Sequence, residues 1–161
     1  MALFTSFNIS ASGMTAQQIR TDVIAENIAN ADTTRTSDGT AYVKKNVIFT
    51  EKTITGTTIG KKASVYSSYS SFADALRLAN GGVVGNGVKV TSIYKDTTTD
   101  MNIVYDPDHP DADENGYVTY PNVNVVQEMT DLIDASRSYE ANISAFNAAK
   151  TMAQKGLSIG E

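Results

Sequence analysis

Apolar positions near the end of the chain recur at alternating steps of three and four residues. Apart from Ser136 and Lys150 the repeat is apolar; its members are Met129, Leu132, Ser136, Tyr139, Ile143, Phe146, Lys150, Ala153 and Leu157. This spacing is that of a coiled-coil seam, which is narrower than the stripe of a globular surface helix. It predicts one helix over residues 122–157, about 54 Å long at about 1.5 Å per residue.

Polar residues lie between these seam positions, and we expect them to face water. They are Glu128, Asp131, Asp134, Arg137, Glu140 and Lys155. Pro121 precedes Asn122, a residue type favoured as an N-cap, and Gly156 and Gly160 suit the far end of the helix. Two interpretations stay open: a seam that pairs with other helices, and a long helix packed on the core of its own domain.

A less regular version of the pattern runs through the first 35 residues. One set at the same spacing comprises Phe7, Ala11, Met14, Gln18, Thr21, Ala25 and Ile28; a second comprises Ala16, Ile19 and Val23, with Ile24 beside it. Apolar residues thus cover more than one side, as in a helix that contacts several neighbours. The helix is predicted to stop near Asn30, which suits the left-handed conformation that closes helices. For Asn27 and Asn30, helix capping and bonding to neighbouring chains both stay open.

The middle of the chain has the alternation and residue types of short strands. AYVKKNVIFTE, GVKVTSIYK, MNIVYD and GYVTY each combine β-branched and aromatic residues. SFADALRLAN, residues 71–80, is predicted as a short helix, although the preceding ASVYSSYSS is equally compatible with a strand. Helical ends around a β-rich middle predict the α+β class.

Composition removes most chemical functions. The 161 residues include no cysteine and a single histidine, His109, which excludes disulfides, thiolate sites and two-histidine metal sites. The net charge of −5 has the wrong sign for a nucleic-acid binder. No apolar run approaches the roughly 18 residues of a membrane span, and the start lacks the basic region of a secretory signal peptide. In TGTTIGKKA the spacing of Gly56 and Gly60 is wrong for a phosphate loop.

One stretch, DADENG at residues 111–116, matches half of a calcium-binding loop. Asp111, Asp113 and Asn115 occupy the first ligand positions, but Asn122 stands where a bidentate glutamate is required. The preceding DPDHP cannot form the helix that should enter the loop. These three residues are weak metal candidates, and the pattern favours an acidic turn that leads into a strand.

Two blocks of sequence resemble a known family. ENIANADTTRTSDGTAYVKKNVIF is similar to the N-terminal signature of bacterial flagellar axial proteins. VYDPDHPDADENGYVTYPNVNVVQEM, followed by SRSYEANISAFNAAKTM, resembles the C-terminal half of proximal-rod proteins of the flagellar basal body. The resemblance covers about residues 1–50 and 88–161, and residues 51–87 are longer than the family leads us to expect.

The resemblance implies an architecture. Residues 1–35 and 122–161 are expected to pair as helices in a coiled-coil-like domain, and residues 36–121, with a variable part at 51–87, to form a small β-rich domain. Pro121, Asn122 and Val123 are expected to form the hinge between them. The expected assembly interface comprises Phe7, Met14, Ile19, Val23, Asn27, Ile28, Asn30, Met129, Leu132, Ser136, Tyr139, Ile143, Phe146, Lys150 and Leu157.

The resemblance also implies a function: a non-enzymatic structural subunit of the rod, the shaft between motor and hook, without a cofactor. Its expected partners are copies of itself, other rod proteins and the flagellar export apparatus, with neither nucleic acid nor membrane insertion. It is expected in the rod spanning the periplasm, exported without a cleaved signal peptide. The alternatives are another axial component of the distal rod or hook, an export adaptor, and an extracellular calcium-dependent binding module.

A physical argument links such helices to assembly. Burial of a large apolar seam residue contributes ~1.5–3 kcal/mol, whereas ordering the backbone costs about 1–2 kcal/mol per residue. A heptad helix on its own has nowhere to bury its seam. We therefore expect the chain ends to fold fully only when neighbouring subunits supply the missing surface.

Overall fold

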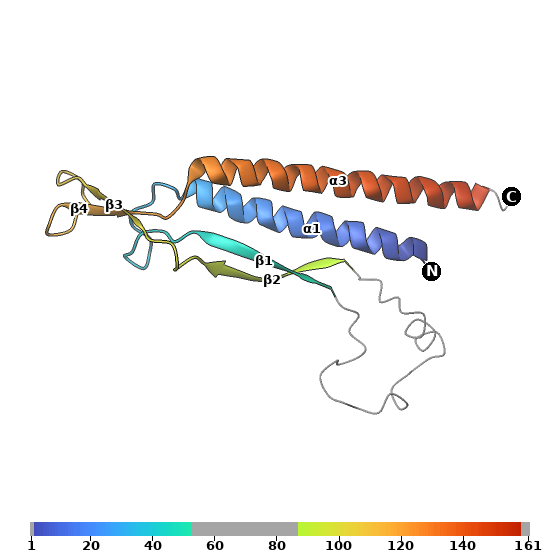
Figure 1. The fold of residues 1–161 in the computed structure, drawn as a ribbon, viewed down its shortest axis with the longest axis horizontal. Coiled ribbons are helices and arrows are strands. Elements are labelled where there is room, and N and C mark those ends of the chain that lie inside the picture. Colours follow the sequence, from blue (N-terminus) through green and yellow to red (C-terminus); the bar gives the residue numbers. More distant parts are fainter. Residues whose placement is uncertain (1, 53–86, 159–161) are drawn as a thin grey trace, which may run out of the picture.

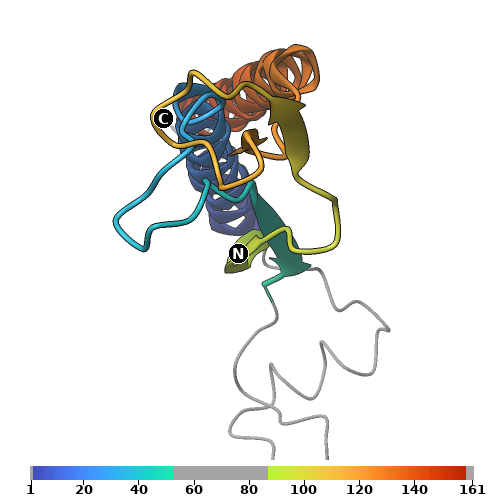
Figure 2. The same ribbon diagram turned by 90° about the vertical axis from the view of Figure 1, so that its left-hand side faces the viewer.

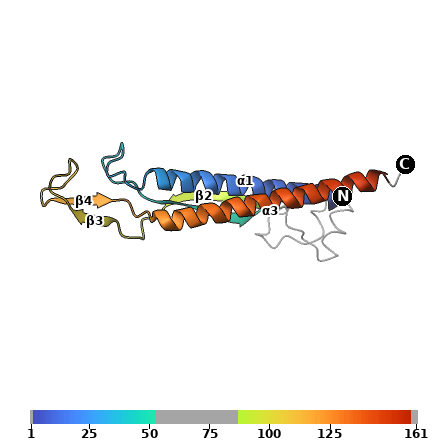
Figure 3. The ribbon, with the colours of Figure 1, turned by 90° about the horizontal axis from the view of Figure 1, so that it is seen from above.

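The computed structural model describes residues 2–52 and 87–158. The segments that resemble a phosphate loop, at 55–63, and a helix or strand, at 63–80, lie outside these residues. The longest elements are two helices, α1 (Ala2–Ala29) and α3 (Val125–Ser158), which lie side by side and antiparallel (Figure 1; Figure 3). Between them in sequence come β1 (Lys45–Glu51), β2 (Val88–Lys95), β3 (Asn102–Tyr105) and β4 (Tyr117–Tyr120).

The described strands form two separate antiparallel pairs, β1–β2 and β3–β4. The predicted α+β class, with paired terminal helices and a small β-rich middle, is therefore confirmed. The β1–β2 ribbon packs along α1, and the β3–β4 hairpin projects beyond the end of the helix pair (Figure 1).

Small residues line the contact between α1 and α3. On α3, Ala135 and Ala149 are buried, and on α1 Gly13 and Ala16 are buried. Gly13 lies against α3, where an added Cβ would lie 2.5 Å from Oδ1 of Asn142. Small side chains permit this approach because they leave room for the neighbouring backbone.

The seam that joins the two helices is shifted by one residue from the heptad spacing in the sequence. It shares Leu132, Tyr139, Phe146 and Ala153 with that spacing, but its other members are Glu128, Ala135, Asn142 and Ala149. Met129, Ser136, Ile143 and Lys150 are exposed instead. On α1 the second stripe faces inward, with Val23 and Ile24 buried, whereas Ala11, Gln18 and Ala25 of the first stripe are exposed.

The edges of the β1–β2 ribbon are held by polar side chains of α1. At the start of β1, the Asn27 side-chain amide accepts a hydrogen bond from the N–H of Lys45 and donates one to its C=O, as a neighbouring strand would. At the start of β2, Ser12 Oγ accepts a hydrogen bond from Val88 N. Beside it Gly87, with φ of 99°, lies so close to Ser12 that no side chain fits. Figure 2 shows the ribbon below α1.

The acidic stretch at 106–116 forms the turn of the β3–β4 hairpin. Asp113 Oδ1 accepts hydrogen bonds from the backbone N–H groups of Asn115 and Tyr117, and Gly116 adopts a φ of 81°. Asp111 accepts a hydrogen bond from Thr34 Oγ1. Within residues 2–52 and 87–158, no group of three or more acidic or histidine side chains is placed to hold a metal ion.

The start of α3 differs from the prediction. The N-cap of α3 is Asn124, whose Oδ1 accepts hydrogen bonds from Val126 N and Gln127 N. Asn122 is not the cap: it is buried, accepts a hydrogen bond from Lys44 N and donates to the carbonyls of Asp96 and Thr99. One amide thus ties two backbone segments to the hinge: the one before β1 and the loop after β2.

The end of α1 also differs from the prediction. Asn30 follows the last helical residue, but no described residue other than glycine has a positive φ. Its side chain instead donates to the carbonyl of Glu26 and accepts from Thr33 Oγ1. A side-chain bond to a helix carbonyl closes α1 without a left-handed residue.

Serine substitutions at Asn122 and Asn124 distinguish the buried hinge amide from the helix N-cap. Serine caps helices about as well as asparagine, so Asn124→Ser is expected to change the free energy of unfolding by less than about 0.5 kcal/mol. Asn122→Ser removes an amide with three backbone partners, and we expect a loss of about 1–3 kcal/mol. Denaturant unfolding of the two purified variants, followed by circular dichroism, measures both values. Equal losses would contradict the assignment of the cap to Asn124.

Candidate functional site

The junction of α1, β1 and α3 is built around the side chain of Asn27. This residue is 1% exposed. Its Nδ2 donates to Lys45 O at 2.9 Å and to Glu128 Oε2 at 3.0 Å. Its Oδ1 accepts from Lys45 N and from the Tyr42 hydroxyl, each at 2.9 Å. An amide offers two donors and two acceptor sites, so its capacity is fully used within the chain.

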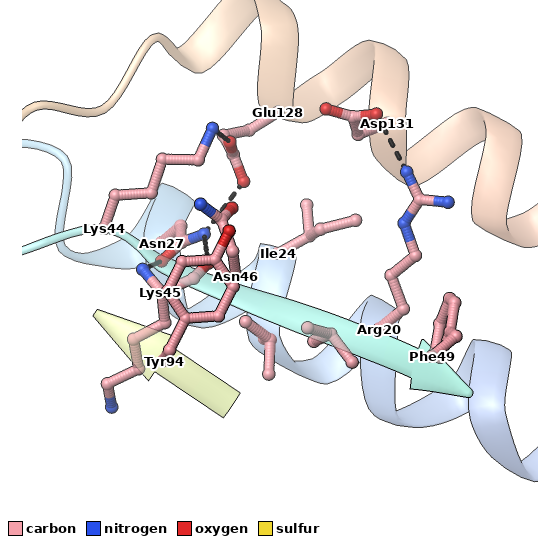
Figure 4. Close-up of a pocket in the computed structure, with 12 residues that line it drawn as sticks. Arg20, Ile24, Asn27, Lys44, Lys45, Asn46, Phe49, Tyr94, Glu128 and Asp131 are labelled. Atoms are coloured by element: carbon pink, nitrogen blue, oxygen red, sulfur yellow. Dashed lines mark hydrogen bonds and ion pairs between the residues drawn. The ribbon is translucent and has the colours of Figure 1, made fainter. Parts of the chain in front are cut away.

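A buried ion pair completes the junction. Glu128 is 2% exposed, and its Oε1 lies 2.6 Å from Nζ of Lys44, which precedes β1 (Figure 4). A carboxylate is buried at such a site only when a cation and hydrogen-bond donors compensate its charge. Burial, together with the negative charges of Glu26 and Glu128, raises the pKa of Tyr42 to about 12. The phenol therefore stays protonated and remains a donor to Asn27.

A second ion pair crosses from α1 to α3 one turn further along. Arg20 Nη2 lies 3.0 Å from Oδ1 of Asp131, and both side chains are about one-third exposed. It borders an open hollow of about 310 Å³ between β1 and α3 (Figure 4). The apolar part of its lining comprises Val23, Ile24, Val47 and Phe49. The hollow has polar rims and a floor formed by α1.

The expected interface residues divide into three groups by exposure. Val23 and Asn27 are buried; Phe7, Met14, Ile19, Ile28, Asn30, Leu132, Tyr139 and Phe146 are half-buried; and Met129, Ser136, Ile143, Lys150 and Leu157 are exposed. The rings of Phe7 and Phe146 meet edge to face at 4.9 Å. The C-terminal end of α3 extends past the start of α1 (Figure 1), and Leu157 is the last residue but one of α3. Whether any of them contacts another subunit remains a prediction.

An apolar stripe on α3 faces away from α1. It comprises Val126, Met129, Ile133 and Ile143, and Val126 and Met129 are 75% and 54% exposed. Val126, Met129 and Ile133 recur at three- to four-residue steps at the start of the helix, so they share one side. Ile143 follows Met129 by two heptads and lies near the same side. Contiguous exposed apolar patches often mark interaction sites, so this stripe is a candidate binding surface.

Reasoning from the sequence missed the polar members of the junction. Glu128 and Asp131 were expected to face water, yet Glu128 is buried and Asp131 is half-buried. A signal for Glu128 was present, because Ala135, Asn142 and Ala149 follow it at steps of seven residues. The residues of that repeat are small or polar, so they give a weaker periodic signal than the repeat that begins one position later at Met129.

Two protein-family models match this chain, one mostly over α1 and the other over β4 and α3. The family model described as "Flagella basal body rod protein" matches residues 7–35, which lie mostly in α1. The model described as "Flagellar basal body rod FlgEFG protein C-terminal" matches residues 114–159, from the end of the hairpin turn through α3.

The curated relatives extend the match to the full length. A protein of Bacillus subtilis, "Flagellar basal-body rod protein FlgC", is 43% identical, with 100% of each chain covered. The chain belongs to the FlgC family of flagellar basal-body rod proteins. FlgC of Borreliella burgdorferi is 42% identical over 99% of this chain and 98% of its own, and FlgC of Salmonella typhimurium 37% over 100% of both.

These matches settle two points about family membership. FlgC similarity runs through residues 51–87, which the resemblance in the sequence had left out. The alternatives of a hook or distal-rod component and of a calcium-dependent module are not favoured, because the quoted full-length relatives are all FlgC proteins.

Alanine substitutions at two adjacent lysines test the buried ion pair. Lys44→Ala leaves the Glu128 carboxylate buried without a cation, and we expect a loss of ~3 kcal/mol in the free energy of unfolding. Lys45→Ala is the matched control, because Lys45 pairs with the more exposed Glu26 and should cost less than about 1 kcal/mol. Denaturant unfolding measures both variants.

A second variant identifies the cause of that loss. Adding Glu128→Gln to Lys44→Ala removes the unpaired charge but keeps an acceptor for Asn27. We expect this double variant to be more stable than Lys44→Ala alone. Additive losses would show that the charge of Glu128 is not what Lys44 compensates.

Proposed function

We propose that this chain is a structural subunit of the flagellar basal-body rod and that it polymerises through outward-facing sides of its terminal helices. Full-length similarity to proteins named as basal-body rod proteins supports the role. The observation that carries the mode of assembly is the apolar stripe of Val126, Met129, Ile133 and Ile143. The pairing of α1 with α3 leaves this stripe uncovered, so a neighbouring subunit supplies its partner surface.

The mechanical role follows from such contacts. Torque passes from the motor to the hook through many parallel helix contacts, each of them weak, and interdigitated side chains resist shear. Ser136 and Lys150 are exposed beside the stripe and fix the register between subunits, as polar residues do in coiled-coil seams. No enzymatic step and no cofactor form part of this role.

Assembly is coupled to the final folding of the helix ends. The buried residues of the helices are mostly small, and the large apolar ones are Val23 and Ile24, near the junction. Pairing within one chain therefore removes little apolar surface from water toward the free ends of α1 and α3. Because ordering each residue costs about 1–2 kcal/mol, these ends become fully helical only between neighbours.

A chain with loose ends also suits export. The subunit travels through the flagellum's own export apparatus and joins the part of the rod that spans the periplasm. A narrow channel admits an incompletely folded chain more readily than a finished rod subunit. Across the described residues, no helix combines the length and the apolar character needed to cross a membrane.

Lysine substitutions in the stripe test the proposed interface. Met129→Lys combined with Ile133→Lys removes two apolar contacts of ~1.5–3 kcal/mol each, so incorporation into rods should fall more than about tenfold. Quantitative immunoblotting of isolated basal bodies from cells that lack the native copy measures incorporation. The control is Ala141→Lys combined with Ala145→Lys, which places the same two charges on another exposed side of α3. Undiminished incorporation of the double variant would contradict the assignment of the stripe.

Hydrogen exchange in the monomer and in assembled rods distinguishes folding coupled to assembly from the docking of helices that are already folded. We expect hydrogen exchange in the purified monomer to be fast in the first turns of α1 and the last turns of α3, and slow near the Asn27 junction. In assembled rods both helices should be protected along their whole length. Equal protection in monomer and rod would defeat the coupled folding and leave the structural role intact.

A further inference from the structure

One edge of β1 is paired with β2, and the other edge is free apart from its first residue. Alternate residues of an antiparallel strand turn their N–H and C=O groups toward the paired strand or away from it. The C=O of Lys44 and the N–H of Lys52, one at each end of β1, both bond to residues that flank β2. Even-numbered residues of β1 therefore face β2, and odd-numbered residues face the free edge.

Val47 and Phe49 present unpaired backbone groups on this free edge. Lys45, the first odd-numbered residue, already bonds the Asn27 amide through both its N–H and its C=O. Among the described residues, none bonds the N–H or C=O groups of Val47 and Phe49. Both residues are half-buried, and unpaired backbone groups that are shielded from water cost free energy. An open strand edge of this kind is a template for a further strand.

The open hollow between β1 and α3 runs along the same edge. Val47 and Phe49 line it, and Val23 and Ile24 of α1 belong to its floor (Figure 4). β1 and α3 both pack on α1 but do not pack on each other, so the space between them stays open. An extended chain placed there would pair with β1 and cover the apolar floor with alternate side chains.

The ribbon beside this edge carries an excess of positive charge. Residues 44–52 and 87–95 contain one acidic residue, Glu51, and five lysines, which are Lys44, Lys45, Lys52, Lys89 and Lys95. The first two lysines are paired within the chain. The other three are exposed and have no ion-pair partner in the part of the chain that the structure describes. A partner with acidic side chains therefore complements the ribbon.

We propose that an extended segment of a different, neighbouring rod subunit adds a third strand to the free edge of β1. Its apolar residues alternate with acidic ones, so that one side covers the floor of the hollow and the other meets the lysines. Backbone hydrogen bonds to Val47 and Phe49 supply affinity, and the side chains supply specificity, as in other cases of strand addition. A single extended chain fits between β1 and α3 more readily than the paired strands of a second copy. The inference rests on the proposed function, since the partner is another subunit of the rod.

Proline substitutions at two directly paired positions test the added strand. Val47 and Ile93 face each other across the ribbon, and the N–H of each points to an outer edge, that of β1 or that of β2. Proline removes an N–H and is tolerated at edge positions of this kind. Val47→Pro should lower incorporation into rods about fivefold, the effect of one lost backbone hydrogen bond, whereas the control Ile93→Pro should leave it unchanged.

Quantitative immunoblotting of isolated basal bodies measures incorporation of both proline variants, and circular dichroism of the purified proteins checks that both fold. Equal incorporation of the two variants would overturn the inference.

Hydrogen exchange on the unmodified chain gives a readout that does not depend on a substitution. The amides of Val47 and Phe49 should exchange at least about tenfold more slowly in isolated basal bodies than in the purified monomer, whereas the Ile93 amide should exchange equally in both. A helix docked in the hollow would leave the two β1 amides without a hydrogen bond. Fast exchange of these amides in basal bodies would therefore overturn the added strand.

Photo-crosslinking identifies the source of the strand. With benzoylphenylalanine in place of Phe49, irradiated basal bodies should yield a crosslinked peptide from another rod protein, and mass spectrometry should show acidic residues alternating with apolar ones in it. A peptide from a second copy, a peptide without acidic residues, or no crosslink in basal bodies that contain the variant would overturn the inference. These results leave the proposed function intact, which fails instead if the unmodified chain is absent from isolated rods.

Discussion

The side-chain amide of Asn27 holds the arrangement of this chain together. It occupies the place of a neighbouring strand at the edge of β1, and it also accepts from Tyr42 and donates to Glu128. A two-stranded ribbon is marginally stable alone, and the fully buried residues of α3 in the helix seam, Glu128, Ala135 and Ala149, are polar or small and bury little apolar surface. Each element therefore depends on the others through this one amide.

The polar junction also determines how the two helices align. Burying Glu128 costs free energy unless Lys44 and Asn27 are both in place, and this requirement fixes one end of α3 against α1. The antiparallel contacts further along follow from that alignment: Arg20 with Asp131, Gly13 with Asn142, and Phe7 with Phe146. Polar seam residues specify register at some cost in stability, which suits the proposed subunit that is completed by its neighbours.

Placing the small and polar residues inside leaves the larger apolar side chains outside. Val126, Met129 and Ile133 point away from α1, and Ile103 and Leu157 lie at opposite ends of the molecule. A monomeric protein with this distribution is prone to associate. In the polymer that we propose, the same distribution separates two functions: the junction defines the shape of each subunit, and the exposed residues are left for contacts between subunits.

The sequence by itself determined the elements and the class of the protein. The positions of both helices and all four described strands, the α+β class and the acidic hairpin turn followed from local periodicity and turn chemistry. Which side of each helix faces its partner was decided by the tertiary structure. The heptad repeat of large residues from Met129 and the repeat of small and polar ones from Glu128 differ by one position, and periodicity does not rank them. The choice rests on Asn27, which is 101 residues away from Glu128, and on the closeness that Gly13 permits. The same holds for Asn122 and Asn124: local preference suits either as the cap, and only the partners of Asn122, from Lys44 to Thr99, assign it to the hinge.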